Sequence, residues 1–273
     1  MADLAADVHR PARRFAAWPL PRGMKNALWA LASAVVAVAI WSAVVLIVKP
    51  PAYILPAPWD VLVRTWTDRA VLFANGGVTM AEILIGLGLG IAIGVPLGIV
   101  IVAIPVVERL FYPIVVAFNA IPKVALAPLF VVWFGYGFLP RVLITGSITF
   151  FPVLVATISG LVAIDPELLR LASVLRAKRS RVFLRMRLPN ALPSIFSGIK
   201  VATSLGVIGG IIAEFVASDK GWGYLLVQAS GTLDTTIMFS IVIILAVVAS
   251  VLFYIVGFAE RFFVSWHASQ RDR

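Results

Sequence analysis

The sequence predicts an all-α membrane protein with six transmembrane helices. Of its 273 residues 61% are hydrophobic and 13% are charged, and the mean hydropathy is +1.01. A soluble domain is about half apolar and carries about 25% charged residues. The excess of apolar side chains therefore indicates a chain whose helices lie in lipid.

Six apolar runs approach the length of about 20 residues with which a helix crosses the hydrocarbon core of a bilayer. They lie at about 27–48, 83–105, 111–134, 142–164, 194–216 and 236–259. Prolines and glycines inside the runs are compatible with helices, because neighbouring helices can satisfy the freed backbone groups. The first run is longer than the apolar region of a cleaved signal peptide, about 7–15 residues, and is expected to be a retained anchor.

Basic residues in the connections predict the orientation, because Lys and Arg are enriched on the cytoplasmic side. With the N-terminus inside, the connections on that side hold sixteen Lys and Arg against five on the other side. An even number of spans returns the C-terminus to the cytoplasm. We expect a multi-pass protein of the inner (plasma) membrane, with cytoplasmic tails at 1–26 and 264–273 and a transmembrane domain at 27–263.

Several function classes lack the residues that they need. The chain has no cysteine, and its two histidines, His9 and His267, lie in the terminal tails, so no metal site or other cofactor is expected. A charge of +10 would suit nucleic acid, but no nucleic-acid motif occurs and the cations lie between apolar runs. No phosphate-binding G-x-x-x-x-G-K-[ST] loop and no catalytic motif is present.

The connection at 165–192 has a pattern of its own. Residues 168–193, LLRLASVLRAKRSRVFLRMRLPNALP, contain seven Lys or Arg and no Asp or Glu. Apolar residues recur there at helical spacing in two pieces, with Lys178–Arg181 at the break, and Pro189 and Pro193 are expected to end the second piece and begin the next span. This pattern predicts two short helices with a docking function. The alternative is that the cations bind anionic lipid headgroups, each worth about 1 kcal/mol.

The same segment resembles the cytoplasmic EAA loop of ABC importer permeases. In that pattern Glu-Ala-Ala is followed by three residues, Gly, nine residues and Ile-x-Leu-Pro. Ala172 fits the second Ala, and Met186, Leu188 and Pro189 fit the closing group. Arg170 stands in place of the Glu and Arg176 in place of the Gly, and Arg disfavours the positive φ of a left-handed turn.

Three further segments resemble the nitrate/sulfonate/taurine type of these permeases. They are LPAPWDVLVRTW at 55–66, AIPKVALAPLFVVWFGYG at 120–137 and IIAEFVASDKGWGYLL at 211–226. The resemblance implies a type I ABC importer permease fold, in which the segment 165–192 forms coupling helices. It also implies a translocation pathway for a nitrate-, sulfonate- or taurine-like anion, or for a small heterocycle such as a pyrimidine vitamin precursor.

The resemblance implies partners as well. They are a dimer of separate ABC ATPase subunits, which hydrolyse the ATP, an external solute-binding protein, and a second permease copy, most simply in a homodimer. The residues expected to dock the ATPase are Ala172, Leu175, Arg176, Lys178, Arg179, Arg181, Phe183 and Pro189.

Polar residues within the apolar runs are candidates for the translocation pathway, because an intramembrane charge is costly. Lys123 and Asn119 lie one helical turn apart and can share a face; Lys123 faces a route, or it bonds a carbonyl freed by a proline. Glu214 faces the exit of the route, or it forms a structural hydrogen bond to the loop that follows. Lys200, fourteen residues earlier, is too far along the helix to pair with Glu214.

Other features predict packing. Trp59, Val61, Leu62 and Trp66 are typical of a helix at the outer membrane interface. Glycines near 86–94 and at 209–210 favour close helix packing. Two other classes are alternatives: a self-sufficient secondary transporter, which normally has more spans or inverted repeats, and a membrane-embedded enzyme, which needs acidic or histidine residues clustered at one depth.

Overall fold

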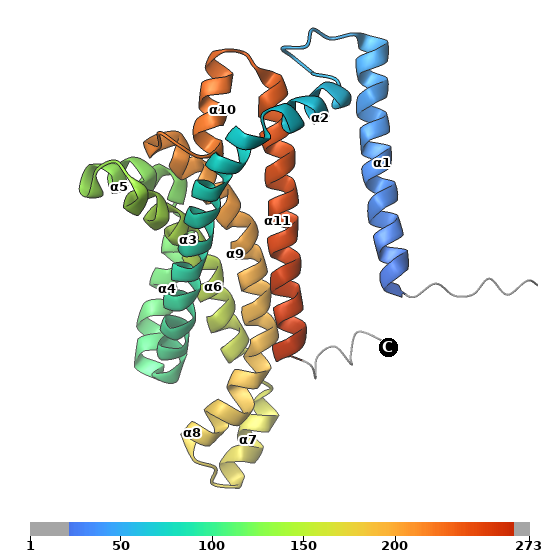
Figure 1. Cartoon of the computed structure of the whole chain (residues 1–273). Coiled ribbons are helices and arrows are strands. Elements are labelled where there is room, and N and C mark those ends of the chain that lie inside the picture. The colour runs from blue at the N-terminus through green and yellow to red at the C-terminus, as the bar shows by residue number, and fades with distance from the viewer. Residues whose placement is uncertain (1–21, 265–273) are drawn as a thin grey trace, which may run out of the picture. The chain divides into compact units, whose positions relative to one another are not determined.

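The computed structural model describes residues 22–264, and every secondary-structure element in that range is a helix. The chain forms two units, Met1–Lys49 and Pro50–Arg273. The described part of the first unit is helix α1 (Arg22–Val48), and all the other helices belong to the second (Figure 1). His9, His267 and most of the two predicted tails lie outside the described residues.

Five described helices are long and apolar enough to cross a membrane, namely α1, α3 (Arg69–Ala103), α6 (Phe138–Val162), α9 (Leu188–Ala217) and α11 (Thr235–Phe263). A sixth span is formed if α4 (Pro105–Ala120) is taken together with the 3-10 turn η1 (Lys123–Leu126) and α5 (Ala127–Phe134). The predicted all-α membrane fold is confirmed. The third apolar run forms a bent helix pair rather than a single straight helix.

The bend of 85° lies between α4 and η1. Ile121 precedes Pro122, and the ring of a proline drives the residue before it out of the helical region. Ile121 accordingly has an extended ψ of 130°, and Pro122 has a ψ of 100°. The third run, 111–134, is therefore not one straight helix, because it contains a backbone break that hydropathy does not register.

Two predicted spans begin earlier than hydropathy alone indicates. Helix α3 starts at Arg69 rather than near 83, and its 35 residues extend over about 52 Å at 1.5 Å per residue. Helix α6 starts at Phe138 rather than near 142. As a result Glu82 and Arg141 lie inside helices.

Helices α3, α6 and α9 pack against one another and form the core of the second unit (Figure 1). Glycines at every fourth residue of α3 face α6, namely Gly86, Gly90, Gly94 and Gly98. A Cβ on Gly90 would lie 2.3 Å from Thr149 Oγ1, which shows how closely the two backbones approach. Close packing at Gly86, Gly90 and Gly94 is thus confirmed, whereas a Cβ on Gly88 would meet nothing within 4 Å.

Short helices lie at both ends of the second unit (Figure 1). Helices α2 (Pro58–Thr67) and α10 (Trp222–Gly231) lie at one end, and α7 (Pro166–Val174) and α8 (Arg179–Val182) lie at the other. The predicted helix near 58–69 is present, with Val61 buried and Trp59 and Trp66 exposed. Arg64 of α2 pairs with Asp234 at the start of α11 at 3.0 Å, which ties the two helices together.

Candidate functional site

The two predicted short helices of segment 165–192 are present. Helix α7 begins at Pro166, and the side chain of Asp165 caps it by accepting a hydrogen bond of 2.8 Å from the Glu167 N–H. After a turn at 175–178 the chain continues through α8 and a π-helical turn, η2 (Phe183–Arg187), into α9. The break between the two pieces therefore lies just before the predicted Lys178–Arg181.

Arg176 occupies a left-handed turn in spite of its side chain, with a φ of +50°. The Arg176 N–H donates to Ser173 O and the Ala177 N–H donates to Ala172 O, both at 3.0 Å. These two bonds form the Schellman motif that ends many helices, usually with Gly at the left-handed position. The turn that Arg was expected to disfavour is kept, and two backbone bonds hold it.

Pro189 does not end the second helical piece, which corrects the sequence-based expectation. No non-helical residue separates α8, η2 and α9. Pro189 has no N–H, so the carbonyl of Arg185, four residues before it, would lack its donor in an α-helix. The chain adapts with a wider turn, in which the Leu188 N–H donates to Phe183 O.

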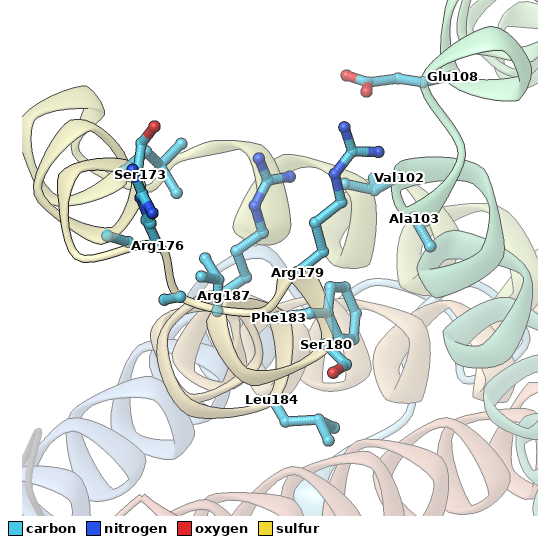
Figure 2. Close-up of a pocket in the computed structure, with 14 residues that line it drawn as sticks. Val102, Ala103, Glu108, Ser173, Arg176, Arg179, Ser180, Phe183, Leu184 and Arg187 are labelled. Carbon is cyan, nitrogen blue, oxygen red and sulfur yellow. The ribbon is translucent and has the colours of Figure 1, made fainter.

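A cavity of about 810 Å³ lies between α7–α8 and the junction of α3 and α4 (Figure 2). Glu108, Val102 and Ala103 line it from the junction. The guanidinium groups of Arg179 and Arg187 extend toward the side on which Glu108 lies (Figure 2). Among the ion pairs of residues 22–264 none involves these two arginines, and Glu108 is the one acidic residue that lines the cavity with them.

The structure brings four of the eight predicted docking residues together around this cavity, namely Ala172, Arg176, Arg179 and Phe183. The other four, Leu175, Lys178, Arg181 and Pro189, do not line it. Leu175 is 70% exposed, and Lys178 and Arg181 are exposed beside it. Phe183 lines the cavity and also packs, partly buried, against the core.

An apolar patch lies on the outer side of α7, next to the cations. Its members are Leu168, Leu171, Val174 and Leu175, all of them exposed. We call this patch, together with Arg176, Lys178, Arg179 and Arg181, the docking surface. Exposed leucine and valine thus lie beside cations that form no ion pair within residues 22–264.

Asn119 and Lys123 lie together at the break between α4 and η1. The Lys123 ammonium donates to the backbone carbonyl of Asn119 and, at 3.2 Å, to its side-chain Oδ1. It also lies 4.8 Å from the centre of the Phe151 ring. The two residues meet across the backbone break rather than on one helix face, and the carbonyl at the end of α4 is the one that Lys123 bonds.

Lys200 and Glu214 have separate partners, as their spacing requires. Lys200 forms an ion pair with Glu260 of α11, a partner that the sequence did not indicate. Glu214 is 1% exposed, and its Oε2 accepts a hydrogen bond from the Gly223 N–H at the start of α10. The hydrogen bond to the following loop is therefore present.

Glu214 belongs to a buried polar cluster with Glu82 of α3 and Arg141 of α6. Arg141 Nη1 lies 2.9 Å from Glu82 Oε1, with the side chains 7% and 0% exposed. This is an ion-pair contact by distance, although it lacks hydrogen-bond geometry. Arg141 also donates to Ser218 Oγ, and through Nε to Gly137 O at 2.8 Å.

The polar cluster lies beside the turn between α9 and α10, which hydrogen bonds attach to α3. Asn75 Oδ1 accepts from the Gly221 N–H, and Thr79 Oγ1 accepts from the Trp222 N–H, both at 2.8 Å. The Trp222 indole donates to Leu72 O at 2.8 Å. Gly221 has a φ of +108°, and a Cβ there would lie 2.2 Å from the Glu214 carboxylate, so only glycine fits.

Sequence reasoning missed Glu82 and Arg141 for one reason. Each lies one residue outside the apolar run assigned to its helix, 83–105 and 142–164, and therefore counted as part of a connection. A sequence-based search could have found them by extending each predicted helix beyond its apolar run. Glu82 and Arg141 would then lie inside spans, where an ionisable residue is a functional candidate.

Comparison with known proteins gives the class of the chain. Residues 86–265 match the family described as "Binding-protein-dependent transport system inner membrane component". The chain belongs to this family, and it is the transport permease of an ABC importer, in which ATP hydrolysis belongs to a separate subunit. A separate ATPase, a solute-binding protein and the membrane are therefore its partners.

Individual relatives cover most of the chain. It is 36% identical to the riboflavin transport system permease protein RibX of Chloroflexus aurantiacus, over 84% of this chain and 86% of the relative. It is 32% identical to the formylaminopyrimidine transport permease protein ThiX of Halalkalibacterium halodurans, over 80% and 88%. It is 27% identical to the taurine transport system permease protein TauC of Escherichia coli, over 92% of each. The predicted nitrate/sulfonate/taurine type is confirmed.

The fold has a solved counterpart. A chain of the MetNI methionine ABC transporter in an inward-facing conformation superposes with a TM-score of 0.55, at 21% identity, over 77% of this chain and 97% of that one. The ABC permease fold predicted from the sequence is thereby confirmed.

Proposed function

We propose that the docking surface on α7–α8 receives the ATPase and transmits its movement to the transmembrane helices. The observation that carries this proposal is that exposed apolar residues and cations lie on the same surface, and that these cations form no ion pair in the described chain. Helix α8 continues through η2 into α9, and α9 packs in the core against α3 and α6. A push on the docking surface therefore has a continuous helical path into the core.

Leu175→Asp tests this proposal. Leu175 is 70% exposed, so the substitution adds a charge to the docking surface without disturbing the fold. We expect loss of the ATPase in co-purification, with membrane insertion unchanged. Leu62→Asp on α2 is the matched control, since Leu62 is 61% exposed at the opposite end of the unit. Unchanged ATPase recovery with Leu175→Asp would contradict the proposal.

We infer an orientation in which α7 and α8, and both termini, lie in the cytoplasm. The excess of Lys and Arg on that side supports it. The chain has no cysteine, so single cysteines can report the topology. The exposed Ser180 and Ser230 lie on α8 and α10, at opposite ends. With an impermeant maleimide on intact cells, Ser230→Cys is expected to react and Ser180→Cys to be protected; the reverse pattern contradicts the orientation.

We propose that two copies of the chain enclose the route, since six spans are too few to do so alone. Asn119 and Lys123 line the route at the break between α4 and η1, whereas Glu214 is 1% exposed and acts through its hydrogen bond to the start of α10. The solute that we favour is a small heterocycle of vitamin-precursor type, which the relatives named for riboflavin and formylaminopyrimidine support. A sulfonate-like anion is the second candidate, because Lys123 forms no ion pair among the described residues. Thermal-shift measurements on the partner solute-binding protein with riboflavin, formylaminopyrimidine and taurine separate the candidates.

A further inference from the structure

The polar cluster of Glu82, Arg141 and Glu214 carries unequal charge. Two carboxyl groups face one guanidinium group, and all three residues are buried, at 0%, 1% and 6% exposure for Glu82, Glu214 and Arg141. A buried carboxylate without a counter-charge is strongly disfavoured. With both acids ionised the cluster would carry a net negative charge that no neighbouring side chain offsets.

The elements around the cluster supply no second cation. Helix α5 has no charged residue, and on α10 the only titratable group is Tyr224. Lys123 of η1 bonds Asn119 and lies over the Phe151 ring. Lys200 of α9 pairs with Glu260 of α11, and Arg69 of α3 lies over the Trp66 ring. Asp219 and Lys220, in the turn between α9 and α10, are exposed to solvent. The charge must therefore be balanced within the cluster itself.

The hydrogen bonds show where the balance is missing. Glu82 Oε1 contacts Arg141, and Glu214 Oε2 accepts from Gly223. Glu82 Oε2 and Glu214 Oε1 are both buried and have no hydrogen-bond partner. Both acids lie beside the same turn, Glu82 through Arg141 and its bond to Ser218, and Glu214 through its bond to Gly223. Each acid thus contributes one unpartnered oxygen.

We propose that Glu82 and Glu214 hold one proton between them, taken up from water, so that the cluster is a neutral proton-binding site. A single proton satisfies both unpartnered oxygens at once, because one carboxyl group donates to the other. It also leaves one negative charge opposite Arg141. Two carboxyl groups that share a site commonly retain a proton in this way.

A metal ion is a poorer occupant than a proton. Within residues 22–264 no three Asp, Glu, His or Cys residues come together as a metal-binding group. Hard cations normally take six or more oxygen ligands, and here two carboxyl oxygens remain without a partner.

The site has a mechanical meaning because it lies under the turn between α9 and α10. Glu214 bonds the start of α10 through Gly223, and Arg141 bonds Ser218 in the turn. The proton therefore keeps the groups that attach this turn to α3 and α6 electrically neutral. Its loss leaves a buried negative charge at this end of the unit, opposite the docking surface.

Infrared spectroscopy of the purified full-length protein tests the proposal, because a protonated carboxylic acid has a carbonyl stretch distinct from that of a carboxylate. Near neutral pH the wild type is expected to show this band, with a shift in heavy water. Glu82→Gln and Glu214→Gln should each lose it, since each leaves one carboxylate opposite Arg141. Glu260→Gln is the matched control and should keep it, because Glu260 pairs one-to-one with Lys200.

Two results would overturn the proposal: absence of the band in the wild type, or its survival in both Gln variants. In each single Gln variant the polar cluster has no net charge, because one carboxylate remains opposite Arg141, and the variant is expected to fold. If one cannot be purified, the other decides the question together with the wild type. If neither can be purified, the wild-type band and its heavy-water shift decide it. Thermal stability gives a second readout, since the double variant leaves Arg141 unpaired and should melt below either single variant.

Discussion

The left-handed turn at Arg176 makes a quantitative prediction about the docking surface. A non-glycine residue pays about 1–2 kcal/mol in the left-handed region, and glycine loses about 0.5–1 kcal/mol more chain entropy on folding. Arg176→Gly should therefore stabilise the turn by about 1 kcal/mol. Because Arg176 has a φ of +50° and donates to Ser173 O, the gain applies to a turn that is already formed.

Hydrogen–deuterium exchange measures this gain directly. The Arg176 and Ala177 N–H groups close the two bonds of the turn, so their exchange reports its opening. A gain of about 1 kcal/mol slows exchange about fivefold. Peptides covering 171–180 in the detergent-purified protein provide the readout.

Arg176→Ala is the matched control, because it removes the same cation but keeps a Cβ at the left-handed position. Exchange in the alanine variant should match that of the wild type or be faster. If the glycine variant exchanges as fast as the alanine variant, the strain assigned to Arg176 is absent and the reasoning fails.

Two further substitutions probe the core and the helix ends. Gly90→Val should destabilise the protein by about 1–3 kcal/mol, because the new Cβ would lie 2.3 Å from Thr149 Oγ1; Gly88→Val, where nothing lies within 4 Å, should melt like the wild type, and equal melting of both variants contradicts the close α3–α6 approach. Lys200→Met should lower the free energy of unfolding by about 1–3 kcal/mol, because it leaves the partly buried Glu260 carboxylate without its partner. The double variant with Glu260→Met should recover most of this loss, and a double variant as unstable as the single one argues against the ion pair.

The sequence predicted the class of fold because composition is a bulk property. Long apolar runs need only length and hydropathy to be recognised, and α11 matches its run closely. The bend at Ile121–Pro122 was missed because hydropathy averages over the backbone break. Proline alone does not settle the matter either, since Pro96 and Pro152 lie within continuous helices.

The functional sites divide in the same way. The docking surface was predictable because a periodic, basic and apolar segment is local in sequence. The polar cluster was not, because Glu82, Arg141 and Glu214 come from three helices and meet only through tertiary packing. The left-handed turn at Arg176 could not be predicted from residue propensities either, because two backbone hydrogen bonds outweigh the preference of this conformation for glycine.

ATP-driven uptake into proteoliposomes is the most direct test of how this permease works. The permease is reconstituted with its ATPase facing the vesicle lumen and with the solute-binding protein outside. Solute should then accumulate in the lumen when ATP is enclosed there. Accumulation should disappear without the ATPase and in Leu175→Asp, and it should persist in Leu62→Asp. Accumulation by the permease alone, or undiminished uptake by Leu175→Asp, would contradict the assignment of α7–α8 as the surface through which the ATPase acts.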